Sequence, residues 1–243
     1  MTAVALVTGG ASGVGAATAL ALRRHGARVA VCDVDPAGAA VAGQCDGLFV
    51  QLDVSDPAAW PPAVDAVTAQ LGPIELAHLN AGVMTAGPKD PIDEAMDLSR
   101  VGADRYDRVV GVNLGGVVHG LRSLWRGMEE QGHGAIVVTA SAAGLAPYPF
   151  DPLYTATKYA AVGLVRAVAP VLAARGVRLQ AICPGGIDTP LLPELGRGLP
   201  LLKPEQVAAA VVELLLAGRE GTVFTIRHDQ PEATAVPDSV AQF

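Results

Sequence analysis

A tyrosine and a lysine stand four residues apart in the segment Tyr154-Thr155-Ala156-Thr157-Lys158. In a helix, this spacing places both side chains on the same face, one turn apart. A free phenol has a pKa of about 10 and is a poor base at neutral pH. A nearby positive charge, such as the lysine ammonium ion, favours the phenolate and lowers that pKa. The pair therefore predicts a group that gives and takes a proton during oxidation and reduction.

The same spacing also occurs in ordinary surface helices, which is the alternative interpretation. The chain has only three lysines, and the other two, Lys89 and Lys203, are flanked by prolines in apparent loops. Lys158 stands instead among apolar residues, where burial of an ammonium ion is costly unless it has partners. This scarcity favours a functional lysine over a solubilising one.

A glycine-rich turn, Thr8-Gly9-Gly10-Ala11-Ser12-Gly13-Val14-Gly15, directly follows the first strand-like run. Gly9 lets the chain leave the strand at unusual dihedral angles, and Gly13 allows the backbone to approach a ligand closely. Gly15 lets the following helix pack against the strand. A pyrophosphate can then bind the free amides of the helix N-terminus. The spacing differs from the common G-x-G-x-x-G fingerprint, and a tight turn without a ligand is the alternative.

An acidic residue, Asp33, ends the second strand-like run. A carboxylate there can accept hydrogen bonds from both ribose hydroxyls of NAD and repels a 2′-phosphate. No arginine or lysine stands at Ala11, Val34 or Asp35 to neutralise such a phosphate. The sequence therefore predicts NAD (NADH) as the cofactor in preference to NADP. An ordinary strand-end turn is the alternative, which the neighbouring Asp35-Pro36 makes credible.

The order of these features and of several others resembles the short-chain dehydrogenase/reductase family, in its compact single-domain form. The resemblance covers nearly the whole chain. The matching segments are Thr8–Gly15, Asp33, Leu52-Asp53-Val54, Asn80-Ala81-Gly82, Asn113, Ser141 with Tyr154 and Lys158, and Pro184-Gly185-Gly186-Ile187-Asp188-Thr189.

The resemblance implies a catalytic role for four of these residues. Tyr154 gives or takes the proton of the substrate hydroxyl, while Lys158 binds the nicotinamide ribose and lowers the tyrosine pKa. Ser141 hydrogen-bonds the carbonyl oxygen and stabilises developing charge. Asn113 holds a water that links the lysine to bulk solvent. The implied reaction is hydride transfer that interconverts a secondary alcohol and a ketone.

The resemblance also implies a cofactor site. In it the glycine-rich turn holds the pyrophosphate, Leu52-Asp53-Val54 contacts the adenine, and Pro184–Thr189 closes over the nicotinamide. No metal site is expected, because the five histidines and three cysteines form no ligand constellation. The predicted cofactor-binding residues are Gly9, Ser12, Gly13, Val14, Gly15, Asp33, Val34, Asp53, Val54, Asn80, Ala81, Gly82, Tyr154, Lys158, Pro184, Gly185, Ile187 and Thr189.

Short apolar runs alternate with helical patterns along the chain, which predicts an α/β fold. We expect one domain over residues 1–243, a Rossmann-type doubly wound parallel sheet of about seven strands with helices on both faces. The expected strands are Ala3–Thr8, Arg28–Cys32, Leu48–Leu52, Ile74–Leu79, Ala135–Ala140, Arg178–Cys183 and Thr222–Ile226. The expected helices are Gly13–His25, Pro57–Leu71, Ala103–Gln131, Leu153–Arg175 and Pro204–Leu216.

The predicted helix Leu153–Arg175 is apolar nearly all round and contains Pro170, which is expected to kink its last turns. A helix without a polar face is either deeply buried or covered by another subunit. The second interpretation predicts a homo-oligomer, either a homodimer or a homotetramer, and the sequence leaves both interpretations open.

Composition narrows the class of protein. Hydrophobic residues make up 51% and charged residues 17%, as in a folded globular chain. The formal net charge of −7, with no basic run, gives no support for binding nucleic acids or anionic membranes. The cysteines are odd in number and resemble reduced core residues. With no signal-peptide pattern and no apolar run of membrane-spanning length, the expected location is the cytoplasm.

Three variable segments, 83–104, 142–153 and 188–203, are expected to determine the substrate. An apolar pocket is expected, so the expected substrate is a small alcohol or ketone with a hydrophobic body. The side chains expected to form this pocket are Met84, Leu145, Pro147, Tyr148, Phe150, Leu191, Leu192 and Leu195. The sequence after Arg227 departs from the family pattern and leads into a polar tail whose role stays open.

Two alternatives accompany this prediction. A non-catalytic NAD(H)-binding sensor on the same fold needs the glycine-rich turn and Asp33 but not Asn113, Ser141, Tyr154 and Lys158. Sugar-nucleotide epimerases and dehydratases use a similar tyrosine-lysine pair, but they carry an added substrate domain for which this chain has no room.

Overall fold

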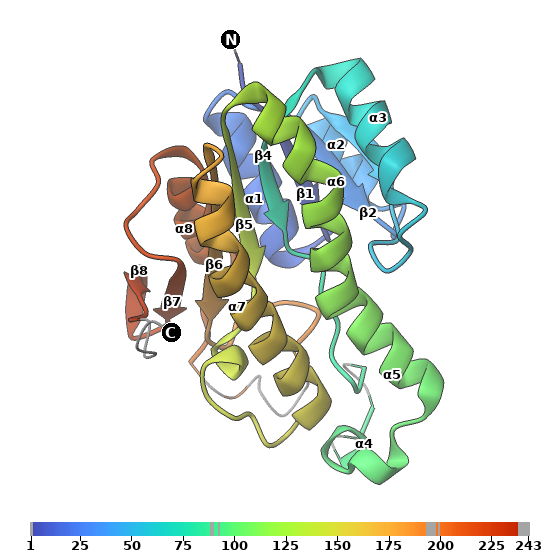
Figure 1. Ribbon diagram of the computed structural model, residues 1–243. Helices are drawn as coiled ribbons and strands as arrows, with labels where there is room; N and C mark the ends of the chain where they lie inside the picture. Colours follow the sequence, from blue (N-terminus) through green and yellow to red (C-terminus); the bar gives the residue numbers. More distant parts are fainter. Residues whose placement is uncertain (1, 88–89, 92, 193–197, 199, 238–243) are drawn as a thin grey trace.

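The computed structural model describes residues 2–87, 90–91, 93–192, 198 and 200–237. One sheet of eight strands forms the centre, in the order β3-β2-β1-β4-β5-β6-β7-β8 (Figure 1). The first seven strands are parallel, and β8 pairs with β7 in the antiparallel direction. The strands are β1 (Val4–Thr8), β2 (Arg28–Asp33), β3 (Leu48–Gln51), β4 (Ile74–Leu79), β5 (Gly134–Thr139), β6 (Val177–Pro184), β7 (Val223–Arg227) and β8 (Gln230–Ala235).

Helices cover both faces of the sheet, which explains why the strands are apolar without alternation. Along β1, Val4 and Leu6 join one hydrophobic cluster, whereas Ala5 and Val7 join the other. On the first face lie α3 (Trp60–Leu71), α6 (Gly116–Gln131) and α7 (Pro152–Ala173). On the second face lie α1 (Gly13–Arg24), α2 (Gly38–Gln44) and α8 (Pro204–Leu216). The predicted doubly wound α/β fold is confirmed.

The direction of winding reverses beside β1, and this places the functional motifs. Strand β1 pairs with β2 on one side and with β4 on the other. At such a point the loops after the two neighbouring strands diverge and leave a crevice at the carboxyl ends. The glycine-rich turn follows β1, and Asn80-Ala81-Gly82 follows β4, so both motifs lie at this crevice.

The sequence predicts no strand after Ile226, but residues Gln230–Ala235 of the polar tail form β8. Five of these six residues are exposed and only Ala233 is buried, so no apolar pattern marks the strand. The strand is instead stabilised by pairing with β7 and by Arg219, whose guanidinium donates to the Ala233 carbonyl oxygen at 2.6 Å. The sheet therefore has one strand more than the sequence predicts.

The predicted helix Ala103–Gln131 is interrupted. The structure has α5 (Ala103–Val110), a π-helical turn η2 (Gly111–Gly115) and then α6. The insertion of one residue in a π-helical turn does not change the apolar pattern enough to be read from sequence. The short elements α2, α4 (Asp93–Met96), η1 (Leu98–Arg100) and η3 (Ala142–Gly144) were also not predicted.

Helix α7 runs without a break through Pro170 and has one buried side and one exposed side. Tyr159 and Val171 are 43% and 44% exposed, so neither complete burial nor uniform exposure describes the helix. By length and composition alone it could cross a membrane, but its buried residues include Thr157 and Lys158 and pack against the sheet. It is a core helix of this fold.

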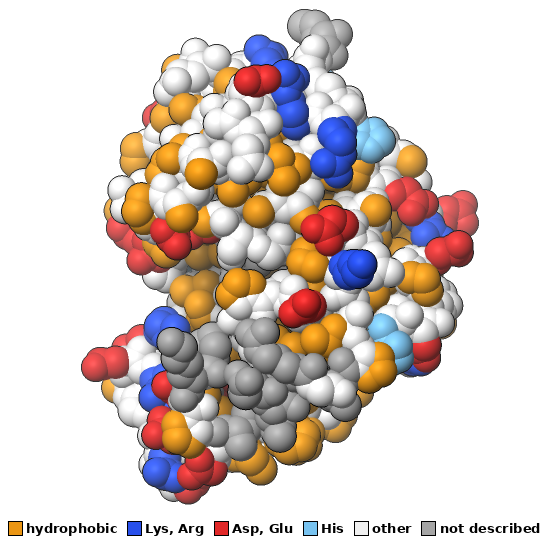
Figure 2. All heavy atoms as spheres, turned by 180° about the vertical axis from the view of Figure 1, so that it is seen from behind, with side chains coloured by type: hydrophobic (Ala, Val, Ile, Leu, Met, Phe, Trp, Pro, Cys, Tyr) orange, Lys and Arg blue, Asp and Glu red, His pale blue; other side chains and the backbone are white. Residues whose placement is uncertain are grey.

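The molecular surface carries charges of both signs. On the face turned away in Figure 1, acidic and basic side chains lie interspersed with apolar ones, with no extended patch of one sign (Figure 2).

Candidate active site

One cavity of about 520 Å³ runs along the carboxyl ends of the strands and brings most predicted site residues together. Among the predicted residues, only Gly15 and Asn113 do not line it. The cavity begins at Asp33, passes the glycine-rich turn, and reaches Ser141, Tyr154 and Lys158. Its predicted lining residues are Gly9, Ser12, Gly13, Val14, Asp33, Val34, Asp53, Val54, Asn80, Ala81, Gly82, Ser141, Tyr154, Lys158, Pro184, Gly185, Ile187 and Thr189.

The glycine-rich turn has the backbone that its sequence predicts. Gly9 and Gly13 have φ angles of 63° and 52°, in the left-handed region that favours glycine. A Cβ atom on Gly15 would lie 2.0 Å from the Gly9 carbonyl oxygen, so Gly15 allows the helix to pack on its own turn. At Gly13, a Cβ atom would point into the space in front of Thr189, 3.1 Å from its methyl group. This open cradle beside the N-terminus of α1 suits a pyrophosphate.

The Asp33 carboxylate accepts hydrogen bonds from the glycine-rich turn and from the residues that follow β2. Its Oδ2 accepts a hydrogen bond from the Ala11 amide at 2.9 Å, and its Oδ1 accepts one from the Asp35 amide at 3.0 Å. The turn-forming role weighed as an alternative is therefore present. A carboxylate has about four acceptor positions, so the two remaining ones can still receive ribose hydroxyls.

The predicted catalytic pair, Tyr154 and Lys158, also lines the cavity. Lys158 is 3% exposed, and its Nζ lies 5.5 Å from the centroid of the Tyr154 ring. The ammonium donates a hydrogen bond to the Thr139 carbonyl oxygen at 3.0 Å. The two side chains thus face the same space, as the i, i+4 spacing predicts.

Burial dominates the proton affinities of this pair. It raises the pKa of Tyr154 to about 12, and a hydrogen bond with Ser141 opposes part of that rise. Burial also lowers the pKa of Lys158 to about 8. Burial is the largest influence on the tyrosine pKa, and its direction is opposite to the lowering that the sequence predicts.

Asn113 lies in the π-helical turn and is 1% exposed. Its Oδ1 accepts from the Val83 amide at 2.8 Å, and its Nδ2 donates to the Val83 carbonyl oxygen at 2.9 Å. The same Nδ2 donates to the Thr157 hydroxyl at 3.1 Å. The side chain therefore ties the segment after Asn80-Ala81-Gly82 to α7. This is the main-chain role that its unfavourable mid-helix position suggests.

Thr139 is a site residue that the sequence prediction missed. Its hydroxyl donates to Asn80 Oδ1 at 3.1 Å, and therefore accepts from His78 Nε2 at 2.7 Å. Asn80 in turn donates to the Gly9 carbonyl oxygen at 3.3 Å. Since the Thr139 carbonyl holds Lys158, this residue connects the lysine to the nucleotide turn. A threonine at the end of an otherwise apolar strand, two residues before Ser141, was the available signal.

The predicted substrate segments contribute mostly apolar side chains to the cavity. Residues from all three predicted substrate segments line it, namely Val83, Met84, Ala142, Ala143, Tyr148, Thr189, Pro190, Leu191, Leu192 and Leu201. Leu145, Pro147 and Phe150, also expected here, do not line it, and Leu195 lies outside the described residues. Ser141 also caps η3, its Oγ accepting from the Ala143 amide at 3.1 Å.

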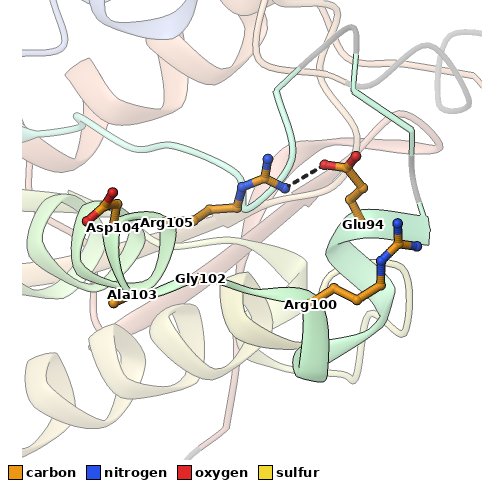
Figure 3. Close-up of a pocket in the computed structure, with 6 residues that line it drawn as sticks. All are labelled: Glu94, Arg100, Gly102, Ala103, Asp104 and Arg105. Atoms are coloured by element: carbon orange, nitrogen blue, oxygen red, sulfur yellow. Dashed lines mark hydrogen bonds and ion pairs between the residues drawn. The ribbon is translucent and has the colours of Figure 1, made fainter.

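A separate pocket of about 490 Å³ lies in the segment around α4 and α5 and shares no lining residue with the first. It is lined by Glu94, Arg100, Gly102, Ala103, Asp104 and Arg105. Figure 3 shows the Arg105 guanidinium directed toward Glu94, with which it pairs at 3.0 Å. Its charges of both signs balance each other, and it contains none of the predicted catalytic groups.

Comparison with known proteins agrees with this geometry. The family model "short chain dehydrogenase" matches residues 3–199. A 3-alpha-(or 20-beta)-hydroxysteroid dehydrogenase of Mycobacterium tuberculosis is 37% identical over 191 residues, which cover 77% of this chain and 70% of the relative. Levodione reductase of Leifsonia aquatica is 34% identical over 241 residues, which cover 96% and 85% of the two chains.

A solved structure of similar fold is the 3-ketoacyl-(acyl-carrier-protein) reductase from Brucella melitensis complexed with NADH. It superposes with a TM-score of 0.85 at 31% identity, covering 94% of this chain and 98% of that one. Together with the match of the family model, these likenesses show that the chain belongs to the short-chain dehydrogenase/reductase family and is an oxidoreductase.

Proposed function

We propose that this oxidoreductase interconverts a secondary alcohol and a ketone by hydride transfer with NAD, and that Tyr154 is its acid-base group. The observation that carries the proposal is the single cavity that joins Asp33 and the glycine-rich turn to Ser141, Tyr154 and Lys158. A nicotinamide cofactor is supported by the family and by the NADH complex of the similar Brucella reductase.

The residues present fit a dinucleotide. The cradle at Gly13 would hold the pyrophosphate, Asp53 and Val54 would contact the adenine, and Pro184–Thr189 would border the nicotinamide. When bound, NAD supplies the hydride acceptor. The protein's own part is to fix the position of the reacting carbon and to move one proton.

The proton is handled by Tyr154. In alcohol oxidation its phenolate takes the hydroxyl proton, and in ketone reduction its phenol returns it. Ser141 donates a hydrogen bond to the substrate oxygen and stabilises the charge that develops there. Lys158 binds the nicotinamide ribose and favours the phenolate. A water held by Asn113 is proposed to link the lysine to solvent.

Preference for NAD over NADP is proposed from Asp33. Its carboxylate has acceptor capacity left for ribose hydroxyls and carries the charge that opposes a 2′-phosphate. The exposed Val34 follows it without a cationic side chain.

The substrate is proposed to be a small molecule with an apolar body. Met84, Leu191 and Leu192 line the same cavity as Tyr154. The names of the hydroxysteroid dehydrogenase and the levodione reductase agree with an alcohol or ketone substrate.

Turnover of a panel of secondary alcohols tests the proposal. Cyclohexanol, 2-octanol and a 3α-hydroxysteroid are each incubated with the protein and NAD at alkaline pH, and NADH absorbance is followed. NADH formation with at least one alcohol is expected. Tight NADH binding without turnover of any member supports the non-catalytic sensor instead.

A further inference from the structure

A buried carboxylate that the proposed mechanism does not use lies one turn from the catalytic tyrosine. Asp151 is 0% exposed and caps the N-terminus of α7. Among the residues that the structure describes, no lysine, arginine or histidine pairs with it. Three hydrogen bonds from uncharged donors hold it instead. Burial of a carboxylate costs free energy unless it accepts short, well-directed hydrogen bonds, so the geometry of these three bonds determines whether Asp151 can be buried here.

The three bonds connect two separate parts of the site. Asp151 Oδ1 accepts from the Tyr154 amide at 3.0 Å and from the Thr85 hydroxyl at 2.6 Å. Asp151 Oδ2 accepts from the Thr85 amide at 2.8 Å. Thr85 is also 0% exposed. One carboxylate therefore fixes both the first turn of the catalytic helix and the segment that follows β4.

Thr85 directly follows two residues of the cavity wall, although its own buried side chain does not line the cavity. Its neighbours Val83 and Met84 line that cavity. Two residues earlier, Val83 is already attached to Asn113. The Asp151–Thr85 bonds add a second attachment, which joins this wall directly to the residue that carries the phenol. A helix cap alone does not need this arrangement, because an exposed Ser or Asn caps a helix equally well.

The charge of Asp151 also acts on the phenol. It opposes formation of a second negative charge nearby and so raises the pKa of Tyr154, in the same direction as burial. The other groups that face this phenol are Lys158 on α7, Ser141 after β5, Tyr148, and Cys183 on β6. Lys158 favours the phenolate and Asp151 disfavours it.

We propose that Asp151 is a positioning residue, which holds the Tyr154 end of α7 against the Thr85 segment and thereby fixes the distance between the proton-transferring group and the substrate wall. The inference rests on the proposed function, in which Tyr154 moves the proton. It concerns Asp151 and Thr85, which have no part in the four-residue catalytic set.

Two variants separate the position of the carboxylate from its charge. In Asp151→Asn, one oxygen becomes an NH₂ group, and because all three partners are donors, at least one bond is lost together with the charge. In Thr85→Val, the hydroxyl bond is lost while the amide bond and the charge remain. Asp56→Asn is the matched control, because Asp56 is an exposed carboxylate that accepts from the Ala58 amide at 2.8 Å outside the cavity.

The variants are assayed with the alcohol of the panel above that the wild-type protein oxidises fastest, and NADH affinity is measured by fluorescence. We expect kcat to fall on the order of 10- to 100-fold in Asp151→Asn and by a smaller factor in Thr85→Val, since small misplacements of a reacting group are costly. NADH affinity is expected to stay within about twofold in both, because neither residue lines the cofactor cradle. Asp56→Asn is expected to behave as the wild type.

The pH profile separates the effect of the Asp151 charge on the phenol from the effect of the lost hydrogen bonds. Loss of the negative charge in Asp151→Asn is expected to move the acidic limb of kcat/KM for oxidation to lower pH, whereas Thr85→Val is expected to leave it in place. An unchanged kcat in both variants overturns the inference. A loss of kcat that matches the unfolded fraction, with no shift of the pH profile of kcat/KM, also overturns it. If Asp151→Asn does not fold, Thr85→Val decides alone through its kcat.

Tyr154→Phe, measured in parallel, separates the two proposals. If this variant stays active, the proposed function fails. If it is inactive while Asp151→Asn and Thr85→Val keep wild-type kinetics, only the positioning inference fails.

Discussion

At the scale of single residues, burial changes the pKa values of the tyrosine and the lysine in opposite directions. Burial raises the pKa of Tyr154 to about 12 and lowers the pKa of Lys158 to about 8. Both changes favour uncharged groups, so the chemistry depends on charges that restore the phenolate. In the proposed mechanism, Lys158 and a bound oxidised nicotinamide would supply those charges. The Thr139 carbonyl oxygen holds the lysine in place.

The first prediction concerns this lysine. Lys158→Met removes the cation, so the pKa of the tyrosine is expected to rise further. The acidic limb of the pH profile of kcat/KM for alcohol oxidation is then expected to move to higher pH. At neutral pH we expect a loss on the order of 100-fold. The pH dependence of kcat/KM checks this. A profile that keeps its wild-type position would show that the lysine does not act on the phenol.

The second prediction concerns cofactor choice. Asp33→Ala removes the charge that opposes a 2′-phosphate, and the ratio of kcat/KM for NAD to that for NADP is expected to fall at least about tenfold, equivalent to about 1.4 kcal/mol. The variant also loses the bonds to the Ala11 and Asp35 amides, so its melting temperature is measured alongside. An unchanged ratio in a folded variant would contradict the assignment of Asp33.

At the scale of secondary structure elements, a side-chain hydrogen bond joins His78 of β4 to Thr139 of β5 within a mostly apolar sheet. His78 is 0% exposed, and burial lowers its pKa to about 3. It is therefore neutral at pH 7 and donates from Nε2 to Thr139. At acidic pH the buried imidazole of His78 has to become charged, and this destabilises the folded state.

The third prediction follows from that ring. Because the folded-state pKa of His78 lies below the ordinary value of 6.5, the unfolded chain binds more protons between those two values. The free energy of unfolding therefore decreases as the pH falls from 6.5 toward 3, and His78 accounts for up to about 1.4 kcal/mol of this decrease per pH unit. His78→Leu is expected to lose less stability than the wild type between neutral and mildly acidic pH. Urea unfolding at several pH values checks this, and parallel losses in both proteins would count against it.

Sequence reasoning located the elements that carry strong local signals. The apolar strands, the turn at Gly9–Gly15 and the Tyr154–Lys158 pair all follow from short-range patterns. It missed β8, which is stabilised by its partner strand and by Arg219, and the π-helical turn at Asn113, which is one residue of extra helix.

The link between Asp151 and Thr85 spans 66 residues of sequence. Nothing local to either residue indicates that the two side chains meet. Long-range contacts of this kind are decided by tertiary packing.

At the scale of the whole molecule, α7 has a role on both of its sides. One side carries Tyr154 and Lys158 into the cavity, and the other exposes Tyr159 and Val171. We propose that a second subunit covers the exposed side in a homodimer or homotetramer, which is one of the two interpretations that the apolar sequence of this helix allows.

The fourth prediction tests that assembly. Val171→Glu places a charge on the exposed side of α7, well after the catalytic turn, and is expected to shift the protein toward monomer because a buried charge is costly at an interface. Sedimentation velocity of wild type and variant measures the change. A wild-type protein that sediments as a monomer would contradict the proposed assembly without affecting the site.

The most direct test of the account is Tyr154→Phe, which removes one hydroxyl group and leaves the ring in place. With the fastest alcohol and NAD, NADH formation is expected to fall at least about 100-fold while NADH affinity and melting temperature stay near the wild-type values. A folded variant that binds NADH and oxidises the alcohol at the wild-type rate would show that another group moves the proton.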